Sequence, residues 1–421
     1  MERGGVCMSF KNIINKISRY KMRLLLGLNF FLVCIFILFL LMTYFTNKED
    51  VLLKKDLTCE FREKIYAMDF VRNLTGTVIE NSLIDTSIVG KKKISFSYRN
   101  RYGLIATKHF EIEIKDVTPP TVIVNNPYVV EIGSVKNLVD TIFCADDYDD
   151  NVTCLILGSY DLDKVGIYHL QVTAMDYSNN TTTKDFTLHV VDHLKEDNSI
   201  KNNGGKHYTS FESVYKKYKQ KDTLIGLDLS RWQEEVDFGK LEEQGVEFVM
   251  LKVGGQKEIG GEMIIDPKFY SNIQEAKAHN MKVGVYFYSY ARSESDAKKQ
   301  VKWIISKIKN YDFDLPIVFD WENWTTYTTF RISFHTLNKI ASTFMKEVEK
   351  NGYDSMLYSS KYYLETIWYS EDYTTWLAYY TENNDYQGDY FMWQLCSDGK
   401  IEGIDGYVDI DVLKLKNKDI G

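Results

Sequence analysis

One feature dominates the N-terminal part of this chain: residues 24–46 form an apolar run of 23 positions without a charged side chain. As a helix rising about 1.5 Å per residue, the run spans a bilayer core of roughly 30 Å. A cleaved secretory signal is the alternative. Its apolar region is usually about 7 to 15 residues long and precedes a small-residue cleavage site, and no such site follows Thr46 here. The sequence therefore predicts a transmembrane anchor at 24–46.

The segment before this run, residues 1–23, is basic. Its only acidic residue is Glu2, and its basic residues are Arg3, Lys11, Lys16, Arg19, Lys21 and Arg23. Positively charged flanks of a membrane span tend to stay on the cytoplasmic side. We therefore expect a single-pass protein of the cell membrane, with a cytoplasmic N-terminus and everything after Thr46 outside.

The composition excludes several classes of protein. A net charge of −8 argues against nucleic acid as a partner, because phosphate backbones are held by clustered Lys and Arg. Six cysteines are too few for a disulfide scaffold, and no His/Cys cluster has the spacing of zinc ligands, so we predict no metal and no cofactor. Cys144 and Cys154 flank an Asp-rich turn, and this spacing leaves open either a short disulfide loop or two free thiols.

Residues 56–192 carry short β-type runs separated by turns. The run IDTSIVGKKKISFSYRN followed by FEIEIKD is echoed by YDLDKVGIYHLQVTAMD followed by FTLHVVD. This repeat predicts two all-β sandwich modules, 56–117 and 118–192. The polar segment 193–221, which contains Gly-Gly, is expected to be a linker.

The second module contains an acidic patch of Asp146, Asp147, Asp149 and Asp150. Clustered carboxylate oxygens suit a hard cation such as Ca²⁺. Asp-rich turns exposed to water are also common, and the sequence leaves both interpretations open.

Residues 222–421 change to a rhythm of apolar strands followed by amphipathic helices. The strand-like runs are LIGLDLS, VEFVMLKV, KVGVYFYSY, PIVFDWE, SMLYSS, TTWLAYY, YFMWQL and YVDIDVLK. Only short segments separate the last three, too short for long helices. Eight strands that begin with βα units predict a closed α/β barrel, similar to a TIM barrel but shorter. An open doubly wound sheet is the alternative, but no Gly-rich phosphate loop follows the first strand.

Carboxylates gather near the ends of these strands, where barrels of this kind place their chemistry. They are Asp228, Asp320, Glu322, Asp409 and Asp411. Because side chains two residues apart share a face of a strand, Asp320 and Glu322 face inward with Val318, whereas Trp321 faces the helices. Any one acid could be purely structural. Together they suit glycoside hydrolysis, which needs one protonated carboxyl and another group that stabilises positive charge.

Aromatic side chains that could stack on sugar rings accompany these acids. They are Tyr286, Tyr288, Tyr290, Trp321, Trp324, Trp376, Tyr380 and Trp393. Other chemistries fit less well, because the only histidines of the domain, His279 and His335, fall on predicted helices and no G-x-S-x-G motif occurs. A magnesium site made of carboxylates alone stays open.

The segments IGLDLSRWQEEVDF, FVMLKVG, VGVYFYSYA, PIVFDWE, TTWLAYY, MWQL and VDIDVL, within residues 223–414, resemble glycoside hydrolase family 25 lysozymes. The resemblance implies a (β/α)5(β)3 barrel and N-acetylmuramidase activity on the β-1,4 bond between N-acetylmuramic acid and N-acetylglucosamine of peptidoglycan. It implies that Glu322 is the general acid, that Asp320 stabilises the reacting sugar, and that Asp228 and Asp409 complete the catalytic set. The residues expected to bind substrate are Tyr286, Tyr288, Trp321, Trp376, Tyr380, Trp393, Gln394 and Asp411.

The module 118–192 resembles bacterial immunoglobulin-like domains, and the module 56–117 resembles them weakly. The leading hypothesis is thus a peptidoglycan hydrolase tethered to the outer face of a bacterial membrane for local cell-wall remodelling, with peptidoglycan glycan strands as its partner. The alternatives are a non-catalytic glycan-binding protein or adhesin, and a chitinase-like glycosidase. Whether the reaction is retaining, inverting or substrate-assisted depends on separations in space.

Overall fold

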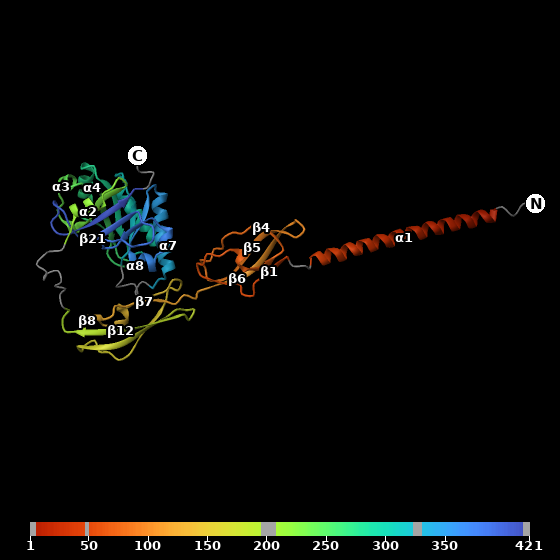
Figure 1. Ribbon diagram of the computed structural model, residues 1–421, viewed down its shortest axis with the longest axis horizontal. Coiled ribbons are helices and arrows are strands. Elements are labelled where there is room, and N and C mark those ends of the chain that lie inside the picture. The colour runs from red at the N-terminus through yellow and green to blue at the C-terminus, as the bar shows by residue number, and fades with distance from the viewer. Residues whose placement is uncertain (1–5, 47–49, 195–207, 323–330, 416–421) are drawn as a thin grey trace, which may run out of the picture. The chain divides into compact units, whose positions relative to one another are not determined.

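The computed structural model describes residues 6–46, 50–194, 208–322 and 331–415, and in the N-terminal helix it describes the side chains of residues 15–41. The chain forms two compact units, Met1–Asp116 and Val117–Gly421. The first unit holds an apolar helix and a small β domain. The second holds another small β domain and an α/β barrel (Figure 1).

Helix α1 covers Val6–Thr46 and contains the apolar run. Its segment Asn15–Leu41, 27 residues long, has a mean hydropathy of 3.0, and its most apolar stretch is not buried against the rest of the chain. By length and composition this helix can cross a membrane, a test that N-terminal signal sequences also pass.

The first β domain is a curled four-stranded sheet with a short strand pair beside it. The strands are β1 (Val51–Leu53), β2 (Thr58–Glu60), β3 (Val71–Leu74), β4 (Gly76–Glu80), β5 (Gly90–Asn100) and β6 (Ile105–Lys115). The sheet order is β2-β6-β5-β4, and β1 pairs with β3. Phe96 and Tyr98 are two residues apart on β5 and form the core with Val51 and Ala67, as the period of two in a strand predicts.

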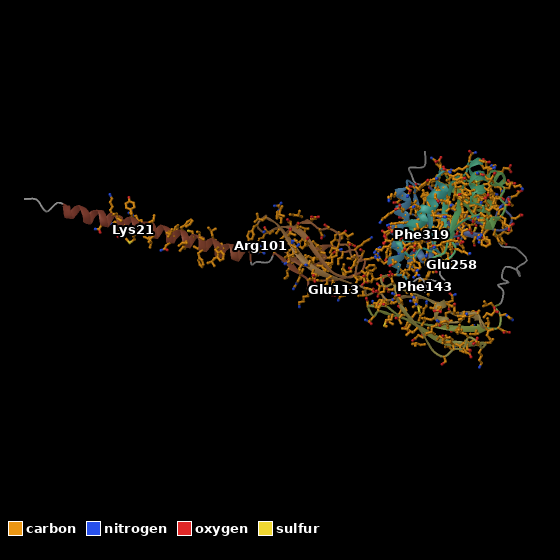
Figure 2. The ribbon with its side chains drawn as sticks, turned by 180° about the vertical axis from the view of Figure 1, so that it is seen from behind. Lys21, Arg101, Glu113, Phe143, Glu258 and Phe319 are labelled. Atoms are coloured by element: carbon orange, nitrogen blue, oxygen red, sulfur yellow. A yellow bond between two sulfur atoms is a disulfide. The ribbon has the colours of Figure 1, made fainter. Side chains whose placement is uncertain are left out.

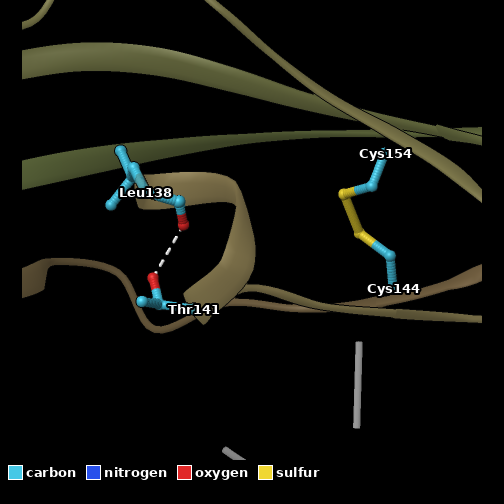
Figure 3. Close-up of a disulfide and its surroundings, with 4 residues drawn as sticks. All are labelled: Leu138, Thr141, Cys144 and Cys154. Carbon is cyan, nitrogen blue, oxygen red and sulfur yellow. Dashed lines mark hydrogen bonds between the residues drawn. A yellow bond between two sulfur atoms is a disulfide. The ribbon is translucent and has the colours of Figure 1, made fainter. Parts of the chain in front are cut away.

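The second β domain repeats the long antiparallel hairpin of the first. Its strands are β7 (Thr121–Ile123), β8 (Tyr128–Glu131), β9 (Phe143–Ala145), β10 (Thr153–Leu157), β11 (Gly166–Met175) and β12 (Thr181–Val191). The sheet order is β10-β11-β12-β8, and β7 pairs with β9. Cys144 on β9 and Cys154 on β10 form a disulfide close to the short helical turn in which the Thr141 hydroxyl donates to the Leu138 carbonyl at 2.7 Å (Figure 3).

The α/β domain is a closed barrel, as the strand count predicts. Among the described residues its eight strands are β14 (Thr223–Leu229), β15 (Phe248–Gln256), β17 (Lys282–Tyr288), β18 (Ile317–Asp320), β19 (Ser355–Ser360), β20 (Thr375–Ala378), β21 (Met392–Lys400) and β22 (Val408–Lys414). The strands from β14 to β21 are parallel, and β22 closes the barrel by pairing antiparallel with both β21 and β14.

Helices follow the first five of these strands and are absent between the last three in the described part of the chain. They are α3 (Phe238–Glu243), α4 (Phe269–Ala278), α5 (Glu294–Ile308), α7 (Phe334–Lys350) and α8 (Lys361–Thr366), and the short strand β16 (Met263–Ile265) pairs with β15. Ser293 and Ser333 cap α5 and α7 by accepting the N–H groups of Asp296 and Thr336.

The barrel has an inner and an outer core, and strand parity decides which residue enters each. Val318 belongs to the inner cluster together with Met250 and Met356. Its neighbours Ile317 and Phe319 belong to the outer cluster, between the strands and the helices (Figure 2 labels Phe319). The alternation predicted for PIVFDWE is thus confirmed.

Residues 193–221 were expected to be a linker, but the structure forms a strand and a helix in the second half of this segment. Thr209–Ser210 form a strand, β13, that pairs with β21, and α2 (Phe211–Tyr218) follows it. Phe211 and Val214 are buried in the outer core of the barrel. The spacing of Phe211, Val214 and Tyr215 is that of one helical face, too short a pattern to stand out among polar residues.

The second β domain also packs on the barrel at the beginning of α7. The rings of Phe143 and Phe334 stack with centroids 6.2 Å apart, and Phe143 is part of the outer core of the barrel (Figure 2 labels Phe143). The carbonyls of Asp146 and Asp147 accept the N–H groups of Phe334 and His335 at 2.8 and 2.9 Å.

The side chain of Asp150 completes this contact. It accepts hydrogen bonds from the Ser333 N–H at 2.7 Å and from the Thr336 hydroxyl at 2.8 Å. The first turn of α7 therefore obtains part of its capping from another domain.

Candidate active site

Four of the predicted carboxylates line one pocket of about 290 Å³ at the mouth of the barrel. Asp228 is the second-last residue of β14, Asp320 ends β18, and Glu322 lies two residues beyond it. Asp409 is near the start of β22. Because β22 runs antiparallel to β14, the start of β22 lies beside the end of β14, at the same mouth of the barrel. The lining residues of this pocket are Asp228, Ser230, Trp232, Gln233, Lys252, Tyr286, Tyr288, Asp320, Glu322, Tyr358, Trp376, Tyr380, Ser397 and Asp409.

Burial and the charges of neighbouring acids raise the pKa values of three of these four carboxyl groups. The pKa of Asp320 is raised well above its usual value by burial, then by the charge of Glu322 and by a hydrogen bond with it. The pKa of Asp228 is raised by burial and by the charge of Asp409. Burial and the Glu322 charge raise the pKa of Asp409 to about 7. The site thus holds carboxylic acids that can donate protons near neutral pH.

Lys252 is the cation of this site. Its ammonium nitrogen lies 5.0 Å from the ring centroid of Tyr288 and 5.8 Å from that of Tyr286. It lowers the pKa values of Asp228 and Asp320 against the larger effect of burial. The sequence analysis missed Lys252, although it shares a strand face with the inward residue Met250.

A buried glutamine, Gln394, connects several residues that line the pocket. Gln394, which is 1% exposed, accepts hydrogen bonds from the hydroxyls of Tyr358 and Tyr380 at 2.7 and 3.0 Å. Its amide donates to Asp228 at 3.4 Å, and Tyr286 also hydrogen-bonds to Asp228. Gln394 therefore positions two tyrosines and a carboxylate. Tyr358 was not among the residues predicted from sequence.

The pocket continues into two neighbouring hollows. One, of about 480 Å³, shares Glu322, Tyr358 and Tyr380 with it. The other, also of about 480 Å³, shares Lys252 and Tyr288. The pocket that holds the acids therefore adjoins a hollow at Glu322 and another at Lys252.

The structure divides the predicted substrate-binding residues into two groups. Tyr286, Tyr288, Trp376 and Tyr380 line the pocket. Tyr290 lines the hollow next to Lys252. Trp324 lies outside the described residues.

Three other residues predicted to bind substrate do not line the pocket. Trp321 is fully buried under the helices and packs edge-on against Trp368, with ring centroids 6.0 Å apart. Trp393 packs edge-on against Tyr218 of α2, with centroids 5.4 Å apart. Asp411 is fully buried and accepts a hydrogen bond from the Trp376 indole at 2.8 Å.

Comparisons with known proteins identify the family of the barrel. The family model described as "Glycosyl hydrolases family 25" matches residues 227–404. "Uncharacterized protein YegX" from Escherichia coli (strain K12) is 30% identical over 195 residues, which cover 45% of this chain and 69% of that protein. The chain belongs to glycosyl hydrolase family 25. Its family 25 domain is the C-terminal one, which carries the four acids.

Solved structures similar to this family 25 chain include the modular autolysin LytC from Streptococcus pneumoniae, in complex with a synthetic peptidoglycan ligand. It is 24% identical, with a TM-score of 0.42, over 57% of this chain and 56% of the LytC chain. The chain thus spans about half the length of LytC. A family 25 glycosyl hydrolase from Bacillus anthracis is 20% identical, with a TM-score of 0.42, over 51% of this chain and 97% of that chain.

Proposed function

We propose that this chain is an N-acetylmuramidase that cleaves the β-1,4 bond between N-acetylmuramic acid and N-acetylglucosamine in peptidoglycan. The observation that carries the proposal is the convergence of Asp228, Asp320, Glu322 and Asp409 in one pocket of a family 25 barrel. The resemblance of the strand-end motifs to family 25 lysozymes gives the substrate.

The Asp320–Glu322 pair supplies the proton in this mechanism. The two carboxyl groups share a hydrogen bond, and the raised pKa of Asp320 favours a proton held between them. Glu322 is the more exposed partner and lines both the pocket and the adjoining hollow, so it can reach a glycosidic oxygen. It acts as the general acid, and Asp320 stabilises the sugar that develops positive charge.

The remaining groups bind and orient the sugar. Tyr288 and Tyr380 are both partly exposed, and each lines the pocket together with a different adjoining hollow. A glycan strand lying across the mouth would occupy both hollows with its scissile bond at Glu322. This arrangement favours cleavage within a strand over removal of single sugars from its end.

The proposal includes a location for this activity, at the surface of a membrane. In the proposal α1 is a single-pass anchor with its basic end in the cytoplasm, and the two β domains are immunoglobulin-like spacers on the outside. The 27-residue apolar segment supports an anchor. Tethering limits the reach of the enzyme and fixes its effective concentration near the membrane, which suits local remodelling of the wall.

The test is an analysis of new sugar ends. Purified peptidoglycan is digested with the detergent-solubilised full chain, reduced with borohydride and hydrolysed. New N-acetylmuramic acid ends are expected with the wild type and with Glu243→Gln, an exposed substitution on α3. Glu322→Gln is expected to lower the rate by about 10²–10⁴-fold. New N-acetylglucosamine ends, or no ends from a folded wild type, would reject the proposal.

A second experiment tests the anchor. In whole cells, replacing residues 1–46 by a cleavable secretion signal should release the enzyme and spread new wall turnover over the surface. Equally localised turnover with and without the anchor would contradict the role proposed for α1.

A further inference from the structure

Three aspartates of the second β domain bring their carboxylates together outside the active site. Asp146 directly follows β9, Asp149 lies in the same turn, and Asp176 directly follows β11. One carboxylate oxygen from each lies within 4.8 Å of the others. Residues from a two-stranded pair and from a four-stranded sheet thus meet at one point.

Hydrogen bonds hold each of these carboxylates in place. Asp146 Oδ1 accepts the N–H groups of Tyr148 and Asp149 at 2.9 and 2.8 Å. Asp149 Oδ2 accepts the N–H of Tyr177 at 2.8 Å. Asp176 accepts the backbone and side-chain N–H groups of Asn180, both at 2.8 Å. The cluster is therefore organised before any ligand arrives.

In the part of the chain that the structure describes, no lysine, arginine or histidine pairs with these aspartates. Asp146 and Asp176 are only 1% and 4% exposed, and within the described residues none of the three aspartates forms an ion pair with Lys, Arg or His. Asp146 Oδ2 is buried without a hydrogen-bond partner there. A buried carboxylate oxygen without any partner is costly, and a bound cation removes that cost.

We infer that Asp146, Asp149 and Asp176 form a divalent cation site of the second β domain, and that its ion is Ca²⁺. The donors are all carboxylate oxygens, which hard cations prefer, and no sulfur or imidazole ligand belongs to the group. Ca²⁺ accepts six to eight oxygens in flexible geometry, whereas Mg²⁺ requires a near-ideal octahedron.

The cation site includes the turn that contacts the barrel. The turn that provides Asp146 and Asp149 also provides the carbonyls and the Asp150 side chain that cap α7 of the barrel. A bound ion would fix this turn and thereby the contact between the β domain and the barrel.

The experiment measures Ca²⁺ binding directly. The full chain in detergent is stripped with EDTA, and ⁴⁵Ca²⁺ binding is followed by equilibrium dialysis up to roughly millimolar free Ca²⁺, the weak end of extracellular sites. One site per chain is expected. Asp176→Asn and Asp146→Asn should weaken its affinity by about tenfold or more. Asp163→Asn, which removes an exposed charge from the same domain, should leave it unchanged.

Thermal unfolding separates loss of the ion from loss of the fold. Ca²⁺ should raise the melting temperature of the wild type and of Asp163→Asn but not that of Asp176→Asn. In EDTA, Asp176→Asn should melt no lower than the wild type, because the substitution removes like-charge repulsion. Three results would each overturn the inference. They are no Ca²⁺ binding by the wild type, wild-type affinity for Ca²⁺ in both Asp146→Asn and Asp176→Asn, and competition by Mg²⁺ as strong as that by Ca²⁺.

Discussion

Asp228 on β14 lies directly opposite Asp409 on β22, in the antiparallel register that closes the barrel. Directly opposed residues have Cβ atoms about 4.5–5.5 Å apart. Two partly desolvated carboxylates at this separation resist joint ionisation, and the pKa values of both are raised. The closure of the barrel thus adds the charge of Asp409 to the burial that raises the pKa of Asp228.

This pair predicts a pH-dependent stability. The pKa of Asp409 is about 7 in the folded chain against an ordinary 3.8, so between these values the folded chain binds more protons than the unfolded chain. Stability from this group is complete below the ordinary pKa and is lost as the pH rises through about 7. Asp409→Asn should therefore raise the free energy of unfolding by roughly 1–3 kcal/mol at about pH 8 and by little at about pH 4.

Thermal unfolding at the two pH values checks this expectation, with Asp405→Asn, an exposed acid before the same strand, as the control. Equal effects of Asp409→Asn at both pH values would contradict it.

Removal of Gln394 should damage both stability and turnover. Gln394→Leu leaves the hydroxyls of Tyr358 and Tyr380 without their shared acceptor and takes a donor from Asp228. An unsatisfied buried polar group costs about 1–3 kcal/mol. We expect a loss of that size in denaturant unfolding and a fall in kcat/KM of at least about tenfold, since 1.4 kcal/mol is tenfold in rate. Gln387→Leu, an exposed site, is the control. Unchanged kcat/KM would exclude a positioning role for Gln394.

Asp411 should be replaceable without loss of activity. It is fully buried behind the pocket, and its pKa is raised well above the usual value, mainly by burial and then by the charges of Asp228 and Asp409. Asp411→Asn keeps the shape and still accepts the hydrogen bond of the Trp376 indole. Turnover should stay within about threefold of the wild type and stability should be equal or higher, because a buried acid is removed. A loss of turnover comparable to that of Glu322→Gln would instead give Asp411 a direct part in the reaction.

The contact of Asp150 with α7 predicts a local effect. Asp150→Ala leaves the buried N–H of Ser333 without its acceptor, which should cost about 1–2 kcal/mol in stability. Hydrogen exchange should rise at the first turn of α7 and stay unchanged in α4, which packs on β15 and β17 rather than on the strands that contact α7. Asp161→Ala, an exposed acid of the same domain, should change neither region. An equal rise in hydrogen exchange in α7 and α4 of Asp150→Ala would show that the effect of Asp150 is not local.

Much of the barrel follows from the sequence because its signals are local. Each strand-like run from LIGLDLS to YVDIDVLK became a strand, and the alternation in PIVFDWE separates Val318 from Phe319 correctly. Asp228, Asp320, Glu322 and Asp409 meet because strand ends meet at a barrel mouth. Their assigned roles stay predictions.

The remaining features depend on contacts between distant segments. Asp411 lies deeper than Asp409 because β22 runs antiparallel to β14, which places it opposite Gly226 rather than at the mouth. Trp393 is covered by Tyr218 of α2, a helix hidden in a polar segment. The partner of Asp146, Asp176, is 30 positions away. Sequence spacing alone reveals none of these three arrangements.

The packing of Phe143, Phe211 and Val214 into the outer core has a practical consequence for anyone who truncates this chain. A fragment that starts at Asp222, just before the first strand of the barrel, would lose all three side chains and uncover the apolar surface beneath them. Exposed patches of this kind promote aggregation. The family 25 domain therefore cannot be separated cleanly from the segments before it, and its shortest soluble fragment should begin at Val117.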